Sequence, residues 1–109
     1  MVELTKENFD ARVTNAEGTV LVDFWSPGCG PCRAMEPVLE AVAARHPEVR
    51  FAKLNAAEHP DIAWAFKAVS VPTLVLFRDG APVDDIVGAV PAQRIEDLLA
   101  KGGREGGGA

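Results

Sequence analysis

The stretch that decides the fold reads Trp25-Ser26-Pro27-Gly28-Cys29-Gly30-Pro31-Cys32-Arg33. It contains both cysteines of the chain, three residues apart. A β-favouring run over residues 20–25 precedes it, and apolar residues at helical spacing follow it over residues 31–46. The run is apolar on both faces, which is typical of a buried central strand. The cysteine pair is therefore expected at the junction between a central strand and a helix.

Outward from this junction, short apolar runs alternate with helical patterns. Strands are expected at residues 2–4, 49–55, 72–78 and 83–88, and helices at residues 5–13, 61–67 and 92–101. Thr5 is the expected cap of the first helix, and Asp79-Gly80 is a hairpin signal. This order predicts an α/β fold with a mixed central sheet of about five strands flanked by about four helices.

Composition limits the domain count and the class of partner. The 109 residues, 48% hydrophobic and 25% charged, suit one globular domain. The net charge of -5 argues against nucleic acid and against an anionic membrane surface. The segment 102–109 is rich in glycine and is interpreted as a flexible tail, which leaves residues 1–101 as the domain. A monomer is the default expectation.

The cellular location is inferred from what the sequence lacks. The N-terminal residues contain no apolar core segment, and no run approaches the roughly 18–20 apolar residues that span a bilayer. We therefore expect a cytoplasmic protein without a membrane partner, in a compartment that keeps thiols reduced.

The cysteine pair is expected to act chemically. A bond between Cys29 and Cys32 closes too small a loop to stabilise the fold much. At a helix N-terminus the unpaired N–H groups favour the Cys29 thiolate, and Cys32 lies within reach on the same face. One thiol can then attack a disulfide and the other can displace the mixed disulfide. The alternatives are an inert pair, or a metal half-site that needs His46 and His59 as further ligands.

Three interpretations concern charged side chains near this pair. Asp23 has only apolar neighbours in its strand, so an inward carboxyl with a pKa raised by burial is favoured over an ordinary strand-end residue. Lys53 lies on a strand and is either functional or simply solvated. Charges on the long helix are interpreted as a solvated face: Glu36, Glu40, Arg45 and Glu48.

Further motifs accompany the segment Cys29-Gly30-Pro31-Cys32-Arg33. They are Val22-Asp23-Phe24-Trp25, Pro37, Lys53-Leu54-Asn55, Val71-Pro72-Thr73-Leu74 and Gly88. Together these motifs resemble the thioredoxin family over residues 2–101. The resemblance is specific because it rests on the whole set, whereas the cysteine spacing alone is not.

The resemblance implies a role for each matching position. Cys29 corresponds to the attacking nucleophile and Cys32 to the resolving thiol. Asp23 corresponds to the buried carboxylate that moves the Cys32 proton, and Lys53 to its cationic neighbour. The implied substrate site is formed by Trp25, Gly28, Gly30, Pro31, Val71, Pro72 and Gly88, with Pro72 as a cis-proline and the Val71 backbone free to pair with an extended substrate segment.

The implied activity is reduction of protein disulfides in cell redox homeostasis, with a thioredoxin reductase that uses flavin and NADPH as the electron donor. No bound cofactor is expected beyond the redox-active Cys29–Cys32 disulfide. The uncharged Gly30-Pro31 pair predicts a reductant, which disfavours an oxidant or isomerase of exported proteins. One position departs from the family, because Gly28 replaces the usual Trp. The alternative is therefore a dedicated reductant or binding partner of one enzyme, with altered docking.

Overall fold

The computed structural model describes the backbone of residues 1–108 and the side chains of residues 1–101. The elements in chain order are β1 (Val2–Leu4), the π-helix η1 (Asp10–Thr14), β2 (Thr19–Trp25), α1 (Gly30–Arg45), β3 (Arg50–Asn55), α2 (Pro60–Ala65), β4 (Thr73–Arg78), β5 (Ala81–Val87) and α3 (Ala92–Gly108). The expected mixed sheet of about five strands with about four helices is confirmed.

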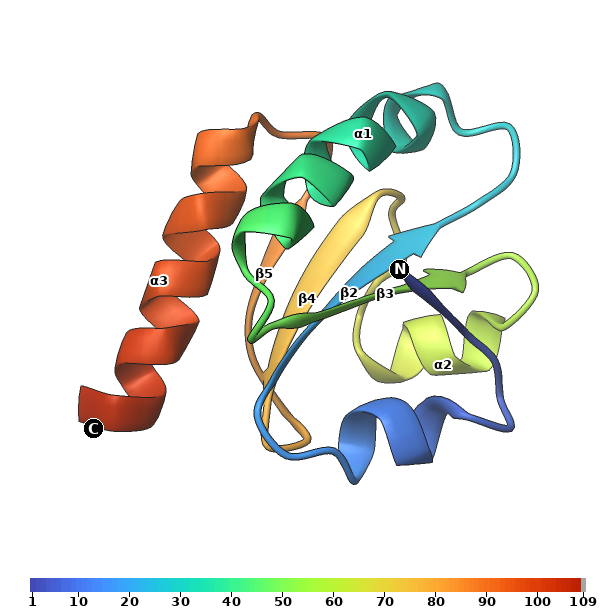
Figure 1. Cartoon of the computed structure of the whole chain (residues 1–109). Helices are drawn as coiled ribbons and strands as arrows, with labels where there is room; N and C mark the ends of the chain where they lie inside the picture. The colour runs from blue at the N-terminus through green and yellow to red at the C-terminus, as the bar shows by residue number, and fades with distance from the viewer. Residues whose placement is uncertain (109) are drawn as a thin grey trace.

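The five strands form one sheet in the order β1-β3-β2-β4-β5. The strands β1, β3 and β2 run parallel, whereas β4 is antiparallel to β2 and β5 is antiparallel to β4. This arrangement places β2 in the centre, where it pairs with neighbours on both sides (Figure 1). The prediction of a buried central strand for the run before the cysteines is therefore confirmed.

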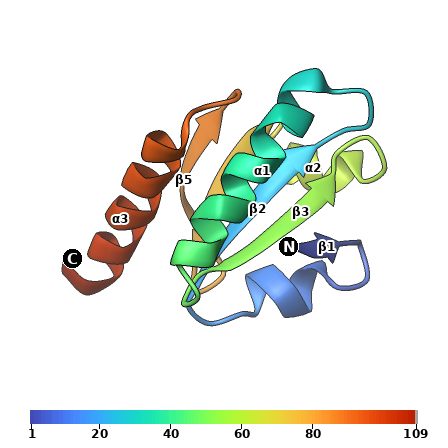
Figure 2. The ribbon, with the colours of Figure 1, turned by 45° about the horizontal axis from the view of Figure 1, so that its top comes forward.

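Helices cover both faces of the sheet. The helix α1 runs in front of β2 in Figure 2, with α2 behind the sheet. Side chains alternate between the faces along β2, so Val22 and Phe24 pack with the cluster that includes Phe9 of the N-terminal segment. Leu21 packs with the opposite cluster, which includes Leu39 of α1 and Ile95 of α3. Asp23 is two residues after Leu21 and therefore lies on the same face of the sheet, so its carboxyl faces α1.

The hairpin between β4 and β5 follows from its turn residues. Asp79 and Gly80 have φ values of 50° and 85°, as a two-residue hairpin turn with two left-handed residues requires. The strand β5 starts directly after the turn, so the expected start at residue 83 is wrong. Pro82 is tolerated inside β5 because the strand lies at the sheet edge, opposite an irregularity at Leu76/Phe77.

The first helix and the last one differ from expectation. The Thr5 hydroxyl accepts a hydrogen bond from the Asn8 N–H at 3.3 Å, as a capping residue does. The following segment widens into a π-helix, because Asn15 N–H bonds to the Asp10 carbonyl at 2.7 Å. The helix α3 continues to Gly108, beyond the expected end near Lys101. The side chains of residues 102–108 and all of Ala109 lie outside the described residues, so the flexible tail stays a prediction.

Candidate functional site

The cysteine pair lies where β2 gives way to α1, as expected. Cys29 is the N-cap of α1, and its φ of -84° and ψ of 103° are extended. The Cys29 Sγ accepts a hydrogen bond from the Cys32 backbone N–H at 3.2 Å. Pro31 occupies the first turn, where its missing N–H removes no helical bond. The first turn of α1 therefore presents a donor to the Cys29 sulfur, which favours a thiolate there after reduction.

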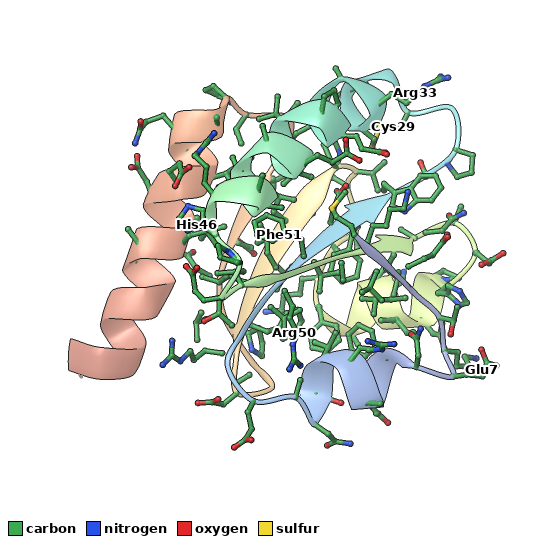
Figure 3. All side chains as sticks on the ribbon, in the orientation of Figure 1. Glu7, Cys29, Arg33, His46, Arg50 and Phe51 are labelled. Carbon is green, nitrogen blue, oxygen red and sulfur yellow. A yellow bond between two sulfur atoms is a disulfide. The ribbon has the colours of Figure 1, made fainter. Side chains whose placement is uncertain are left out.

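Cys29 and Cys32 form a disulfide whose Cα atoms are 5.3 Å apart. Cys29 is half-buried at the start of α1 (Figure 3), whereas Cys32 is buried with 5% of its surface exposed. Cys29 is therefore the more exposed of the two cysteines.

Asp23 is buried beneath α1. Its exposed fraction is 3%, and its Oδ1 atom has no hydrogen-bond partner among the described residues. Burial, and after it the charge of Glu36, raises the pKa of Asp23 to about 7, against an opposing effect of Lys53. The inward carboxyl expected from the sequence is confirmed. An acid with this pKa can take up or release a proton near neutral pH.

Lys53 is the Cα partner of Asp23 on β3, yet its ammonium group lies against other residues. Its Nζ is 3.9 Å from Glu36 Oε1 and 5.5 Å from the centre of the Trp25 ring. The contact between Glu36 and Lys53 was not predicted from the sequence, which assigned Glu36 to a solvated helix face. The spacing could have indicated it, because Glu36 follows Cys32 by four residues and so lies above the same part of the sheet.

The loop before β4 lies at the same edge of the sheet as the cysteines, because Thr73 pairs with Phe24 at the end of β2. The Val71–Pro72 bond is cis, as expected, and the Pro72 carbonyl accepts a hydrogen bond from Gly88 N–H at 2.8 Å. Within the described residues the Val71 backbone makes no hydrogen bond. The structure thus joins Pro72 to Gly88 and leaves a backbone donor and acceptor open at Val71.

A cavity of about 290 Å³ lies beside the cysteine pair. Its lining residues are Trp25, Ser26, Pro27, Gly28, Cys32, Arg33 and Glu36. Gly28 has a φ of 79°, and no atom lies within 4 Å of the place where a Cβ would stand. The position directly before Cys29 is therefore open, with a backbone conformation that favours glycine.

The histidines of the metal alternative lie in other contacts. His46 lies against Glu96 and Glu48, with nitrogen–oxygen distances of 2.5 and 3.2 Å, and His59 Nε2 lies 3.1 Å from Glu58. The described residues contain no group of three or more His, Cys, Asp or Glu side chains that could hold a metal ion. Over the same part of the chain no helix is long and apolar enough to cross a membrane.

Comparison with known proteins adds the relatives of the chain. The family model described as "Thioredoxin" matches residues 1–101. The chain belongs to the thioredoxin family. A thioredoxin of Porphyra purpurea is 40% identical over 100 residues, which cover 91% of this chain and 94% of the relative. A thioredoxin of Staphylococcus aureus (strain Mu50 / ATCC 700699) is 40% identical over 102 residues, 93% of this chain and 96% of the relative.

Membership and the cysteine geometry together establish the activity. The chain is a protein-disulfide reductase that works by thiol–disulfide exchange through the Cys29–Cys32 pair. The expectations drawn from the sequence for family, fold and reaction type are confirmed. The roles of the surrounding residues are a separate question, because they depend on proton movement and substrate contact.

Proposed function

We propose that the exchange proceeds with Cys29 as nucleophile, Cys32 as resolving thiol and Asp23 as the acceptor of the Cys32 proton. The Cys29 thiolate attacks one sulfur of a substrate disulfide, forms a mixed disulfide and releases one substrate thiolate, which takes a proton. Cys32 passes its proton to Asp23 and attacks the Cys29 sulfur, which releases the second substrate thiolate. Two electrons reach the substrate, and the Cys29–Cys32 disulfide forms.

The observation that carries this division of labour is the burial of the Asp23 carboxyl, whose Oδ1 atom has no hydrogen-bond partner among the described residues. The Asp23 pKa of about 7 allows this group to accept a proton from a buried thiol without permanent charge. Lys53 modulates Asp23, because its charge favours the ionised carboxylate and opposes the effect of burial. The lower exposure of Cys32 fits the resolving role, since this sulfur needs to reach only Cys29.

An extended substrate segment is proposed to pair with the open backbone groups of Val71. Pro72 and Gly88, joined by their hydrogen bond, would border this segment on one side. The N-terminal turn of α1 would border it on the other side, with Gly30 and Pro31 exposed there and Trp25 and Gly28 lining the adjacent cavity. Main-chain hydrogen bonds depend little on the side chains of the substrate, which suits a reductase that acts on many proteins.

The reduced state is proposed to be restored by a thioredoxin reductase that draws electrons from NADPH through a flavin. The chain would then carry electrons from that enzyme to protein disulfides in the cytoplasm, where thiols are kept reduced. The uncharged Gly30-Pro31 pair supports this direction, because no cation inside the motif stabilises the thiolate further. A monomer is sufficient for each of these steps.

A narrower function is favoured by one observation. The open position at Gly28 removes the apolar surface that the family usually places beside the first cysteine. A dedicated reductant or binding partner of one enzyme would supply its own side chain there. Reduction rates for several unrelated disulfide proteins distinguish the two functions, because a general reductase acts on all of them and a dedicated one on a single partner.

The test of the proposed roles is insulin reduction coupled to NADPH and a thioredoxin reductase. We expect Cys29→Ser to lose turnover and to trap no substrate, because its nucleophile is gone. We expect Cys32→Ser to lose turnover but to accumulate a mixed disulfide through Cys29. Trapping by Cys29→Ser in place of Cys32→Ser would reverse the assignment of the two sulfurs. A Cys29→Ser protein that still supports a partner enzyme would indicate a binding module.

A further inference from the structure

Glu36 lies at the point where the surface of α1 meets the buried acid. We propose that Glu36 is a positioning residue for the resolving step: it holds the Lys53 ammonium group away from the Asp23 carboxyl and so controls when Asp23 can take the Cys32 proton. The kinetic part of this inference rests on the proton role proposed for Asp23, whereas the electrostatic part does not.

The geometry brings three charged side chains together under the first half of α1. Asp23 and Lys53 are Cα partners on neighbouring strands, so both side chains belong to the face that α1 covers. Glu36 stands one turn after Cys32 and lines the same cavity as that cysteine. Residues from three elements, β2, β3 and α1, therefore share this small volume.

The direction of the Lys53 side chain is the decisive observation. The register alone would place this cation beside the Asp23 carboxyl. Its Nζ instead lies 3.9 Å from Glu36 Oε1 and over the Trp25 ring, while Asp23 Oδ1 is left without a partner among the described residues. Glu36 and Trp25 thus compete with Asp23 for the Lys53 ammonium group, and the buried acid keeps its proton more firmly.

The charges that face Asp23 can be counted by element. The helix α1 contributes the Glu36 carboxylate, and β3 contributes the Lys53 ammonium group. The facing residue of β4 is Leu74, which is apolar, and Trp25 of β2 is neutral. One anion and one cation therefore act on Asp23, and the anion also binds the cation.

Removal of the Glu36 charge has two effects on Asp23, and both lower its pKa. The repulsion between Glu36 and the Asp23 carboxylate disappears, which favours the ionised form of Asp23. The Lys53 ammonium group loses its carboxylate partner and can approach Asp23, which favours the ionised form again. We therefore expect Glu36→Gln to lower the pKa of Asp23 by about 1 unit, in the range usual for a single nearby charge.

The experiment follows the Asp23 carboxyl carbon by NMR through a pH titration of the oxidised full-length chain. The matched control is Glu40→Gln, since Glu40 is exposed on the same helix and makes no ion pair among the described residues. We expect a lower Asp23 pKa in Glu36→Gln and an unchanged one in Glu40→Gln. Equal Asp23 titrations in Glu36→Gln and the unmodified chain would overturn the inference.

A double-variant cycle tests whether Glu36 acts through Lys53. In a Lys53→Met background the effect of Glu36→Gln on Asp23 should shrink, because only the direct repulsion remains. An undiminished shift in that background would overturn the positioning role, since Glu36 would then act by its own charge alone.

The pH profile of the resolving step separates this inference from the proposed function. We expect the rate at which Cys32 displaces a mixed disulfide on Cys29 to rise with pH through the Asp23 pKa, and its midpoint to move to lower pH in Glu36→Gln. An Asp23 pKa that moves with an unmoved rate midpoint would support the electrostatic role of Glu36 and contradict the proton role of Asp23. If Glu36 had only a structural role, Glu36→Gln would change neither the Asp23 pKa nor the midpoint of the rate profile.

Discussion

The two ends of α1 handle charge in opposite ways. At the N-terminal end, the carboxyl of Asp23 is buried, and its Oδ1 atom has no hydrogen-bond partner within residues 1–101. At the C-terminal end, His46 lies 2.5 Å from Glu96 of α3, and Arg45 reaches the same carboxylate at 2.8 Å. Figure 3 shows His46 where α1 ends beside α3.

The difference lies in how the fold acts on the charged forms at the two ends. Contact with Glu96 raises the pKa of His46, while contact with Arg45 lowers the pKa of Glu96, so the fold favours both charged forms. Burial of Asp23 instead raises its pKa, so the fold opposes the charged form. Paired charges at one end join two helices, whereas ionisation of the buried acid at the other end costs stability.

The largest expected effect is a gain of stability in Asp23→Asn at high pH. The folded pKa of about 7 exceeds the unfolded value of 3.8, so the native state binds more protons and loses stability as pH rises between these values. A neutral Asn avoids this loss, and we expect its free energy of unfolding to exceed the unmodified chain's by about 4 kcal/mol at pH 8.5. Urea unfolding at pH 8.5 and near pH 4 measures the difference.

The gain should shrink toward pH 4, because Asp23 becomes protonated in both folded and unfolded chains. A gain of equal size at both pH values would assign the effect to packing and would remove the contrast between the two helix ends.

A smaller effect is expected at the glycine beside Cys29. Gly28 has a φ of 79° with free space around it, so Gly28→Ala should cost about 1 kcal/mol from backbone strain alone. Gly30→Ala is the matched control, because Gly30 lies in the first turn of α1 with equal space and without a left-handed φ. We expect no loss of stability in the control; chemical unfolding compares the two, and equal losses would contradict the strain argument.

The smallest expected effect concerns the paired end. The raised pKa of His46 gives stability that is present below about pH 6.5, the ordinary histidine value, and is lost as pH rises through the higher folded value. Glu96→Gln should therefore lower the melting temperature slightly, more at pH 6 than at pH 9, with insulin reduction unchanged. The charges facing His46 are Glu48 from the adjoining loop, Glu96 from α3 and Arg45 from α1.

The control for this contrast is Asp97→Asn on the same helix, since Asp97 accepts a hydrogen bond from Gln93 at 2.9 Å and makes no ion pair with His46 or Arg45. We expect the melting temperature of Asp97→Asn to differ from that of the unmodified chain by almost the same amount at pH 6 and pH 9. A Glu96→Gln protein whose stability follows pH like that of the unmodified chain would show that His46 does not stabilise the fold through this pair.

Much of the fold and of the reacting pair could be predicted because the signals are local. The run before the cysteines, the helical spacing after them and Asp79-Gly80 each encode structure within a few residues. The apolar neighbours of Asp23 predicted its burial for the same reason. The π-helical turn after Asp10 and the early start of β5 were missed, because no residue pattern marks a wide helical turn and because Pro82 disfavours a strand.

The charge contacts could not be predicted, since they depend on register and side-chain direction. Glu96 is distant in sequence from His46 and meets it only once α1 and α3 pack together. The resemblance implied Lys53 as the cationic neighbour of Asp23, and no sequence pattern indicated that its ammonium group would lie against Glu36 and Trp25. Residues on a helix face that the sequence assigns to solvent can therefore belong to a site beneath that helix.

The central claim is that the buried acid Asp23, at the N-terminal end of α1, takes the Cys32 proton. The most direct measurement is the pH dependence of mixed-disulfide resolution in the unmodified chain and in Asp23→Asn. We expect a rise with a midpoint near pH 7 in the unmodified chain, which follows the Asp23 pKa, and loss of that rise in Asp23→Asn with a lower rate above pH 7. Identical profiles for the two proteins would contradict the claim.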